Sequence, residues 1–114
     1  MAIHSRARRP SALLLRAVGI ASNQHVFGLF DSGHMSGERV DRFLAALPDG
    51  VSELYCHPAT RRWQGLDCLP DDYLCVEEFE ALASTVRRER LEREGVKLIR
   101  FADLAMVQRR TDRR

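Results

Sequence analysis

The chain has 114 residues, of which 45% are hydrophobic and 30% are charged, and this composition is typical of one soluble globular domain. It excludes a disordered or fibrous chain. Eighteen Lys and Arg against sixteen Asp and Glu give a net charge of +2, which is too balanced to indicate a nucleic acid as a partner.

The two ends of the chain are basic. We expect residues 1–12 to be a disordered start and residues 109–114 a loose tail, with the domain between them at 13–108. The run of apolar residues that begins at Ala12 imitates a signal peptide, but Arg16 interrupts it after four residues. An amphipathic helix without a membrane span is the better interpretation, since a span needs about 18 apolar residues. The three cysteines suit reduced thiols, so the sequence predicts a cytoplasmic protein.

The first regular segments follow residue 25. Residues 25–30 predict a short strand, and the turn-rich loop 31–37 offers Ser36 as a helix cap. A helix should follow, because apolar residues recur at i, i+3, i+4 and i+7, namely Val40, Phe43, Leu44 and Leu47. The Pro-Asp-Gly at 48–50 then ends this helix and turns the chain into a second strand.

The second strand, residues 51–57, is the most informative segment, because it ends on a histidine. Pro58 disfavours the helical region for the residue before it, so His57 should be extended and be the last residue of the strand. Side-chain alternation places Glu53, Tyr55 and His57 on one face. In parallel α/β proteins ligands bind at the carboxyl ends of strands, so His57 is the candidate catalytic residue.

The second half of the chain repeats the alternation. A long connection, residues 59–73, is typical of a functional loop. A single helix is predicted over 76–94, with acids in its first turn and arginines near its end, and Gly95 should end it. Residues 96–101 then predict a third strand and residues 102–109 a short final helix.

This alternation of helices and strands predicts an α/β fold with about three parallel strands joined by right-handed crossovers. Three strands cannot close into a barrel, which takes about 250 residues. We therefore expect a partial (β/α) barrel-like fold that either pairs with copies of itself or is one part of something larger.

Three segments carry a resemblance to a known family: Val26 to Met35, Leu47 to Thr60 with its Glu-Leu-Tyr-Cys-His-Pro run, and Gly95 to Leu104. In order and separation they resemble the C-terminal portion of the YdjC-like carbohydrate deacetylases. The similarity covers roughly residues 13–105, and it is closest to the hopanoid-biosynthesis-associated branch called HpnK.

The resemblance implies a metal-dependent hydrolase that removes acetyl from an N-acetylated sugar. In the hopanoid branch the sugar is attached to a lipid, which would place the protein at the inner membrane surface. The family's divalent metal, Mg or Zn, is held by an early Asp-Asp pair and by later histidines, and these lie upstream of the part represented here. The resemblance therefore implies no metal ligand in this chain. It suggests a missing N-terminal segment or a homo-oligomer, and an isolated chain that is inactive.

Of the family's site residues, the resemblance places the histidine of the His-Pro motif on His57. Amide hydrolysis needs an acid for the departing amine and a donor for the tetrahedral oxyanion, and an imidazole can be either. The alternative is a buried histidine whose ring bonds a backbone group.

Substrate contacts are predicted on both loops that follow the strands. Arg61 and Trp63 could offer hydrogen-bond donors and an indole face to a sugar, although the Trp could instead anchor the loop. Asp31 and His34 could line the same rim, although Asp-Ser-Gly is also ordinary turn chemistry.

Two further alternatives follow from the residues. Zinc bound by Cys56, His57, Cys68 and Cys75 is disfavoured by their spacing. A truncated or accessory module that self-associates without turnover is the non-enzymatic alternative, and an exposed sheet edge would favour it.

Overall fold

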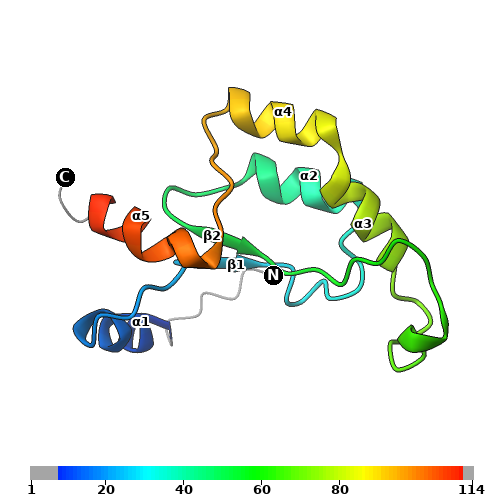
Figure 1. The fold of residues 1–114 in the computed structure, drawn as a ribbon, viewed down its shortest axis with the longest axis horizontal. Helices are drawn as coiled ribbons and strands as arrows, with labels where there is room; N and C mark the ends of the chain where they lie inside the picture. The colour runs from blue at the N-terminus through cyan, green and yellow to red at the C-terminus, as the bar shows by residue number, and fades with distance from the viewer. Residues whose placement is uncertain (1–7, 112–114) are drawn as a thin grey trace. The chain divides into compact units, whose positions relative to one another are not determined.

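The computed structural model describes residues 8–111, so the expected disordered start and tail lie partly outside the described residues. The chain divides into two units, residues 25–97 and the two terminal segments together. Helices and strands are labelled in Figure 1. Within residues 8–111, every helix is too short or too polar to cross a membrane.

The central unit contains a two-stranded parallel sheet. Strand β1 (His25–Phe27) pairs with β2 (Ser52–Leu54), and His25 is opposite Ser52. The helix between the strands, α2 (Gly37–Ala45), supplies the crossover that parallel strands require. The α/β class and the parallel direction of these two strands therefore agree with the sequence pattern. Two strands do not establish a barrel.

The core of this unit lies between the sheet, α2 and α3 (Cys75–Ala83). Its buried members are Met35, Val40 and Ala81, and partly buried apolar side chains pack against them: Phe43, Leu44, Leu54 and Cys56. The stripe predicted for α2 is thus on the buried side. In Figure 1, α2 lies over the sheet and α3 lies past the ends of the strands, and the two helices contact each other.

The single helix predicted over 76–94 is wrong. Ser84 has an extended backbone, with ψ at 115°, and separates α3 from α4 (Thr85–Arg93). The Ser84 side chain accepts a hydrogen bond from the backbone N–H of Arg87, at 3.3 Å, so it caps α4. Gly95 follows α4, as expected, and the amide of Val96 bonds back to the carbonyl of Leu91 at 2.8 Å.

Three strand predictions are also corrected. The first strand ends at Phe27 and not at residue 30, because Gly28 takes a φ of +92° and turns the chain away. The second strand has no partner beyond Phe27 and ends at Leu54, so His57 lies three residues past it in irregular chain. The third strand predicted over 96–101 is wrong: residues 96–100 are irregular and pair with no strand within 8–111, and Phe101 begins a 3-10 turn.

One capping prediction changes as well. Ser36 stands at the start of α2, but its side chain makes no capping hydrogen bond. Its backbone carbonyl instead accepts a hydrogen bond from the amide of Val40, at 2.9 Å.

The described part of the terminal unit combines helices with irregular chain over residues 18–24 and 98–100. Helix α1 (Arg8–Ala17) comes from the amino-terminal segment. A short 3-10 turn, η2 (Phe101–Asp103), leads into α5 (Leu104–Thr111), where a helix was expected. Leu104 is its buried residue.

Candidate functional site

His57 lies in irregular chain between two tyrosines. Its ring centroid is 4.9 Å from that of Tyr55, edge to face, and 5.2 Å from that of Tyr73. The side chain is half-buried, and its Nδ1 is buried with no hydrogen-bond partner among the described residues. An unpaired buried nitrogen is uncommon, because desolvation is then not offset. The expected alternative, a ring that bonds a backbone group, does not occur at Nδ1.

The backbone of His57 is held by a buried carboxylate. Glu78, on α3, has no exposed surface, and its Oε2 accepts the amide hydrogen of His57 at 2.5 Å. Its Oε1 accepts the amide hydrogen of Met35 at 2.9 Å. One side chain therefore joins the segments that follow β1 and β2.

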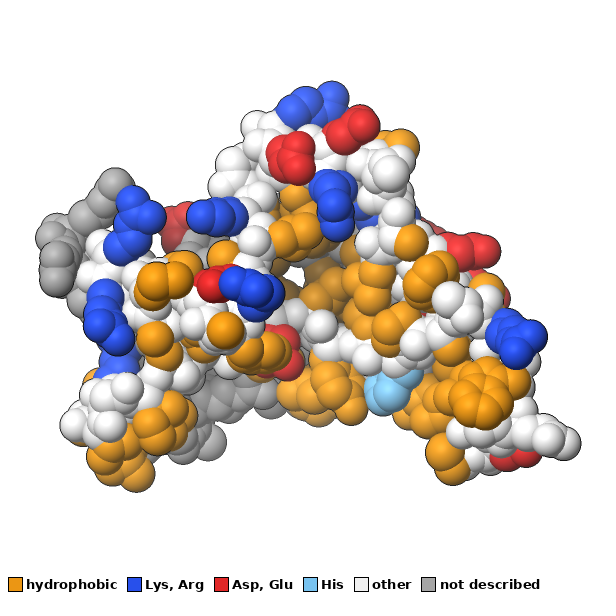
Figure 2. Space-filling model, viewed as in Figure 1, with side chains coloured by type: hydrophobic (Ala, Val, Ile, Leu, Met, Phe, Trp, Pro, Cys, Tyr) orange, Lys and Arg blue, Asp and Glu red, His pale blue; other side chains and the backbone are white. Residues whose placement is uncertain are grey.

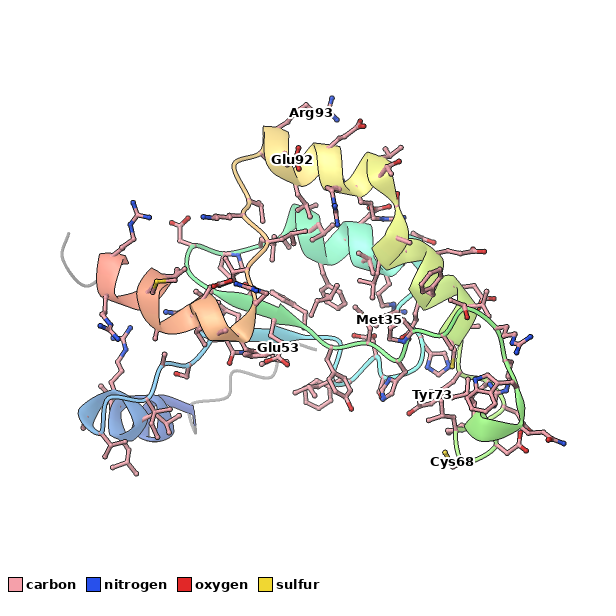
Figure 3. All side chains as sticks on the ribbon, in the orientation of Figure 1. Met35, Glu53, Cys68, Tyr73, Glu92 and Arg93 are labelled. Carbon is pink, nitrogen blue, oxygen red and sulfur yellow. The ribbon has the colours of Figure 1, made fainter. Side chains whose placement is uncertain are left out.

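His34 lies on the loop after β1 and contacts the same tyrosine. Its ring centroid is 6.1 Å from that of Tyr73. Its Nε2 is 3.1 Å from the carboxylate of Asp72, and its Nδ1 is 3.1 Å from the carbonyl of Ser32. Tyr73 is thus shared by His34 and His57, and Figure 3 shows it on the segment before α3.

Asp31 has a different local role. Its carboxylate pairs with Arg39 on α2 and is mostly shielded from solvent. The pair ties the loop after β1 to the helix that follows. The carboxylate is therefore occupied by an intramolecular contact.

The long loop between β2 and α3 is held by an arginine. The guanidinium of Arg62 donates to four backbone carbonyls of residues 69–73, the shortest bonds being to Pro70 at 2.9 Å and Leu69 at 3.1 Å. Arg61 is exposed beside it, and the Trp63 side chain is 57% exposed. The indole also covers Gly65 within the same loop. The loop is therefore ordered around Arg62 and presents Trp63 to solvent.

The described residues do not fit a metal. Nowhere in 8–111 do three His, Cys, Asp or Glu side chains gather in a way that could hold an ion. Cys68 is exposed while Cys75 is buried, so the four residues considered for zinc are in different environments. Burial, helped by the charge of Glu78, raises the pKa of the Cys56 thiol to about 11.

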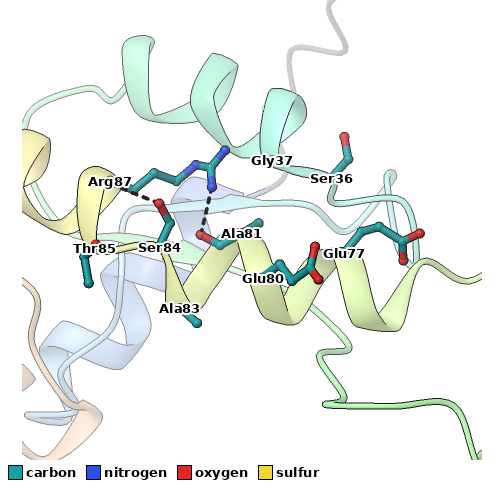
Figure 4. A pocket seen from close by; sticks show the side chains of 9 residues that line it. All are labelled: Ser36, Gly37, Glu77, Glu80, Ala81, Ala83, Ser84, Thr85 and Arg87. Carbon is teal, nitrogen blue, oxygen red and sulfur yellow. Dashed lines mark hydrogen bonds between the residues drawn. The ribbon is translucent and has the colours of Figure 1, made fainter.

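A shallow depression elsewhere on this unit gathers none of these residues. It lies where α2 begins and where α3 passes into α4, and it is lined in part by Gly37, Glu80 and Arg87 (Figure 4). The Arg87 guanidinium bonds both carboxylate oxygens of Asp41, at 2.8 and 2.9 Å, and the carbonyl of Ala81. It therefore offers little to a ligand.

Sequence reasoning missed two members of the His57 site, Glu78 and Tyr73. Glu78 looked like one of several acids suited to the start of a helix. Its signal was its spacing, because Cys75, Glu78 and Ala81 fall three residues apart on the face of α3 that is buried. The apolar side chains of Phe79 and Leu82, on the same helix, are exposed.

The comparisons with known proteins point to one family. The family model for YdjC-like proteins matches residues 2–93, which is most of the chain. No curated protein and no solved structure matches this chain.

Proposed function

The chain belongs to the YdjC-like family, and from this premise we propose that it forms the C-terminal part of a carbohydrate deacetylase, with His57 as its site residue. Family membership is consistent with a function of this kind. The proposed reaction adds water to the amide of an N-acetylated sugar and yields acetate and an amine. The proposed substrate is a sugar on a hopanoid lipid, as in the branch called HpnK, which would place the protein at the cytoplasmic face of the inner membrane.

One observation carries the assignment of His57: its ring is held between two tyrosines while Nδ1 has no partner among the described residues. In the proposed reaction His57 would be either a hydrogen-bond donor to the tetrahedral oxyanion or the acid for the departing amine.

The sugar would be bound by the loops that follow the strands. Trp63 offers an exposed indole face, and Arg61 offers a side chain that is open to solvent. His34 would line the same rim with an exposed ring whose nitrogens bond Ser32 and Asp72. Asp31 would act indirectly, by holding the loop that carries His34. The family is generally metal-dependent, yet residues 8–111 offer no set of ligands, so we propose that the metal site belongs to a segment upstream.

The test is acetate release from N-acetylated sugar oligomers, with Mg²⁺ or Zn²⁺ added. The 114-residue chain should release none by itself. Release that chelation and His57→Ala both abolish would contradict this inactivity. If the reading frame continues upstream of Met1, the longer protein should be active, and His57→Ala should lower its turnover by roughly 10²–10⁴-fold. An unchanged rate would remove His57 from the mechanism.

A second candidate is the non-enzymatic accessory module that self-associates. It is favoured by large apolar side chains that are exposed on the central unit, among them Phe30 at 90%. Figure 2 shows hydrophobic side chains gathered over α3 and the segment before it. Sedimentation equilibrium tests this candidate, because a stable oligomer without sugar binding would favour it and a monomer would count against it.

A further inference from the structure

Glu78 is the one charged side chain that is fully buried among the residues whose burial is described, which are 13–107, 109 and 110. The neighbouring acids on α3, Glu77 and Glu80, are exposed. No described cation pairs with Glu78, so its charge is balanced by hydrogen bonds to backbone amides. Burying a carboxylate is costly, and its retention in a helix of nine residues calls for a reason beyond packing.

Glu78 accepts hydrogen bonds from two backbone amides that lie past the ends of β1 and β2, where the strands no longer pair. The ladder between β1 and β2 ends with the bond from the Tyr55 amide to the Phe27 carbonyl, at 2.8 Å. Beyond that point Gly28 turns one chain away, and the amides of Met35 and His57 both bond to the Glu78 carboxylate on α3. The carboxylate replaces the missing ladder bonds with two bonds from a helix. Figure 3 shows Met35 between the sheet and α3.

From this geometry we infer that Glu78 is the positioning residue of the His57 site: it holds the backbone of His57 so that the imidazole remains between Tyr55 and Tyr73. With its amide fixed and Pro58 behind it, His57 has little backbone freedom, and from this fixed backbone its ring packs against Tyr55 and Tyr73. The inference rests on the proposed role of His57. It adds a carboxylate that acts through the backbone and touches no reacting atom.

Glutamine is the sharpest replacement. A carboxylate can accept both amide hydrogens, whereas a Gln side chain has one carbonyl oxygen and an NH₂ group that cannot accept. Glu78→Gln therefore keeps the size of the side chain and breaks one of the two bonds. Glu80→Gln is the matched control, because it removes the same charge from an exposed position on the same helix.

The measurement is NMR of the purified 114-residue chain. Two aromatic rings within about 5 Å shift the ring protons of a histidine, and that shift reports on the position of the His57 ring. In Glu78→Gln the ring-proton signals of His57 should move toward those of an exposed histidine, while the His25 signals stay in place. Glu80→Gln should leave both unchanged. A structural role alone would lower stability without this selective displacement.

Amide exchange in the wild-type chain gives a second measurement, which decides the matter if Glu78→Gln does not fold. The amides of Met35 and His57 lie outside helices and strands, yet both should exchange roughly tenfold or more slowly than unbonded amides. Unprotected amides, or a folded Glu78→Gln chain with unmoved His57 signals, would overturn the inference. Neither measurement uses turnover, so a failure of the proposed function would appear separately, in the acetate assay.

Discussion

The aromatic ring of Tyr73 fills the space that a β-carbon would need at Gly33. The amide of Leu74 also donates to the carbonyl of Gly33, at 2.7 Å, and Ser32 Oγ is 3.2 Å from the Tyr73 hydroxyl. The loop after β1 is therefore packed directly against the segment that precedes α3. Because the same ring contacts His57, this packing forms one wall of the candidate site.

Gly33→Ala should be costly for two reasons, the positive φ of +79° and the collision with Tyr73. Gly95→Ala is the matched control, because Gly95 has a similar φ of +74° with nothing near the added carbon. We expect about 1 kcal/mol for Gly95→Ala and about 2–4 kcal/mol for Gly33→Ala, measured by urea unfolding. Equal losses would contradict the packing of Tyr73 on Gly33.

Ser84→Ala should destabilise the first turn of α4, which the Ser84 side chain caps. The Ser84 hydroxyl accepts the amide hydrogen of Arg87, and loss of such a cap costs about 1 kcal/mol. Ser36→Ala is the control, since Ser36 begins α2 without a side-chain bond and should cost only a few tenths. Urea midpoints of the two variants check the difference. A larger loss for Ser36→Ala would contradict the capping assignment.

The pair of Asp41 and Arg87 should stabilise the contact of α2 with α4 in a pH-dependent way. Hydrogen bonds from Arg87 lower the pKa of the Asp41 carboxyl below its ordinary 3.8. The folded pKa is below the unfolded one, so the stabilisation is present above pH 3.8 and is lost as the pH falls through the folded value.

Because Asp41 is partly exposed, a double-mutant cycle of Asp41→Asn and Arg87→Gln should give a coupling of only about 0.5–1 kcal/mol at pH 7. The exposed pair Glu38 and Arg42 should give less. Equal couplings for the two pairs would contradict a special role for Arg87.

Of the three thiols, Cys68 should react before Cys56 and Cys75 with a disulfide reagent at pH 8. Cys68 is exposed and should react first, whereas Cys75 is buried and Cys56 is mostly protonated, since burial and the charge of Glu78 raise its pKa from 9.0 to about 11. The folded pKa of Cys56 is above the unfolded one. Its contribution to stability is therefore complete below pH 9 and decreases as the pH rises toward 11. Rapid reaction of Cys56 in the folded chain would contradict its environment.

The sequence predicted the elements whose signals are local. The stripe from Val40 to Leu47 predicted α2, and the strands on either side of it run parallel, as a helical crossover requires. The lengths of the strands could not be predicted in this way, because a strand continues only as far as its partner does. Gly28 ends β1 through its backbone conformation, and β2 then loses its partner, so His57 falls outside the sheet.

The candidate site was predictable only in part, for the same physical reason. His57 could be selected because it precedes a proline. Glu78 could not, since an acid near a helix start is ordinarily a solvated residue that suits the helix dipole. Its buried role depends on which face of α3 packs against the rest of the central unit, and this face carries Cys75, Glu78 and Ala81.

The central claim, that His57 faces a bound N-acetylated sugar, is tested most directly by titrating the 114-residue chain with N-acetylglucosamine oligomers and following the histidine ring protons by NMR. The account predicts that the His57 signals shift in a saturable way, that the His25 signals do not, and that glucosamine oligomers, which lack the acetyl group, have a smaller effect. Unmoved His57 signals, or equal shifts with both ligands, would contradict it.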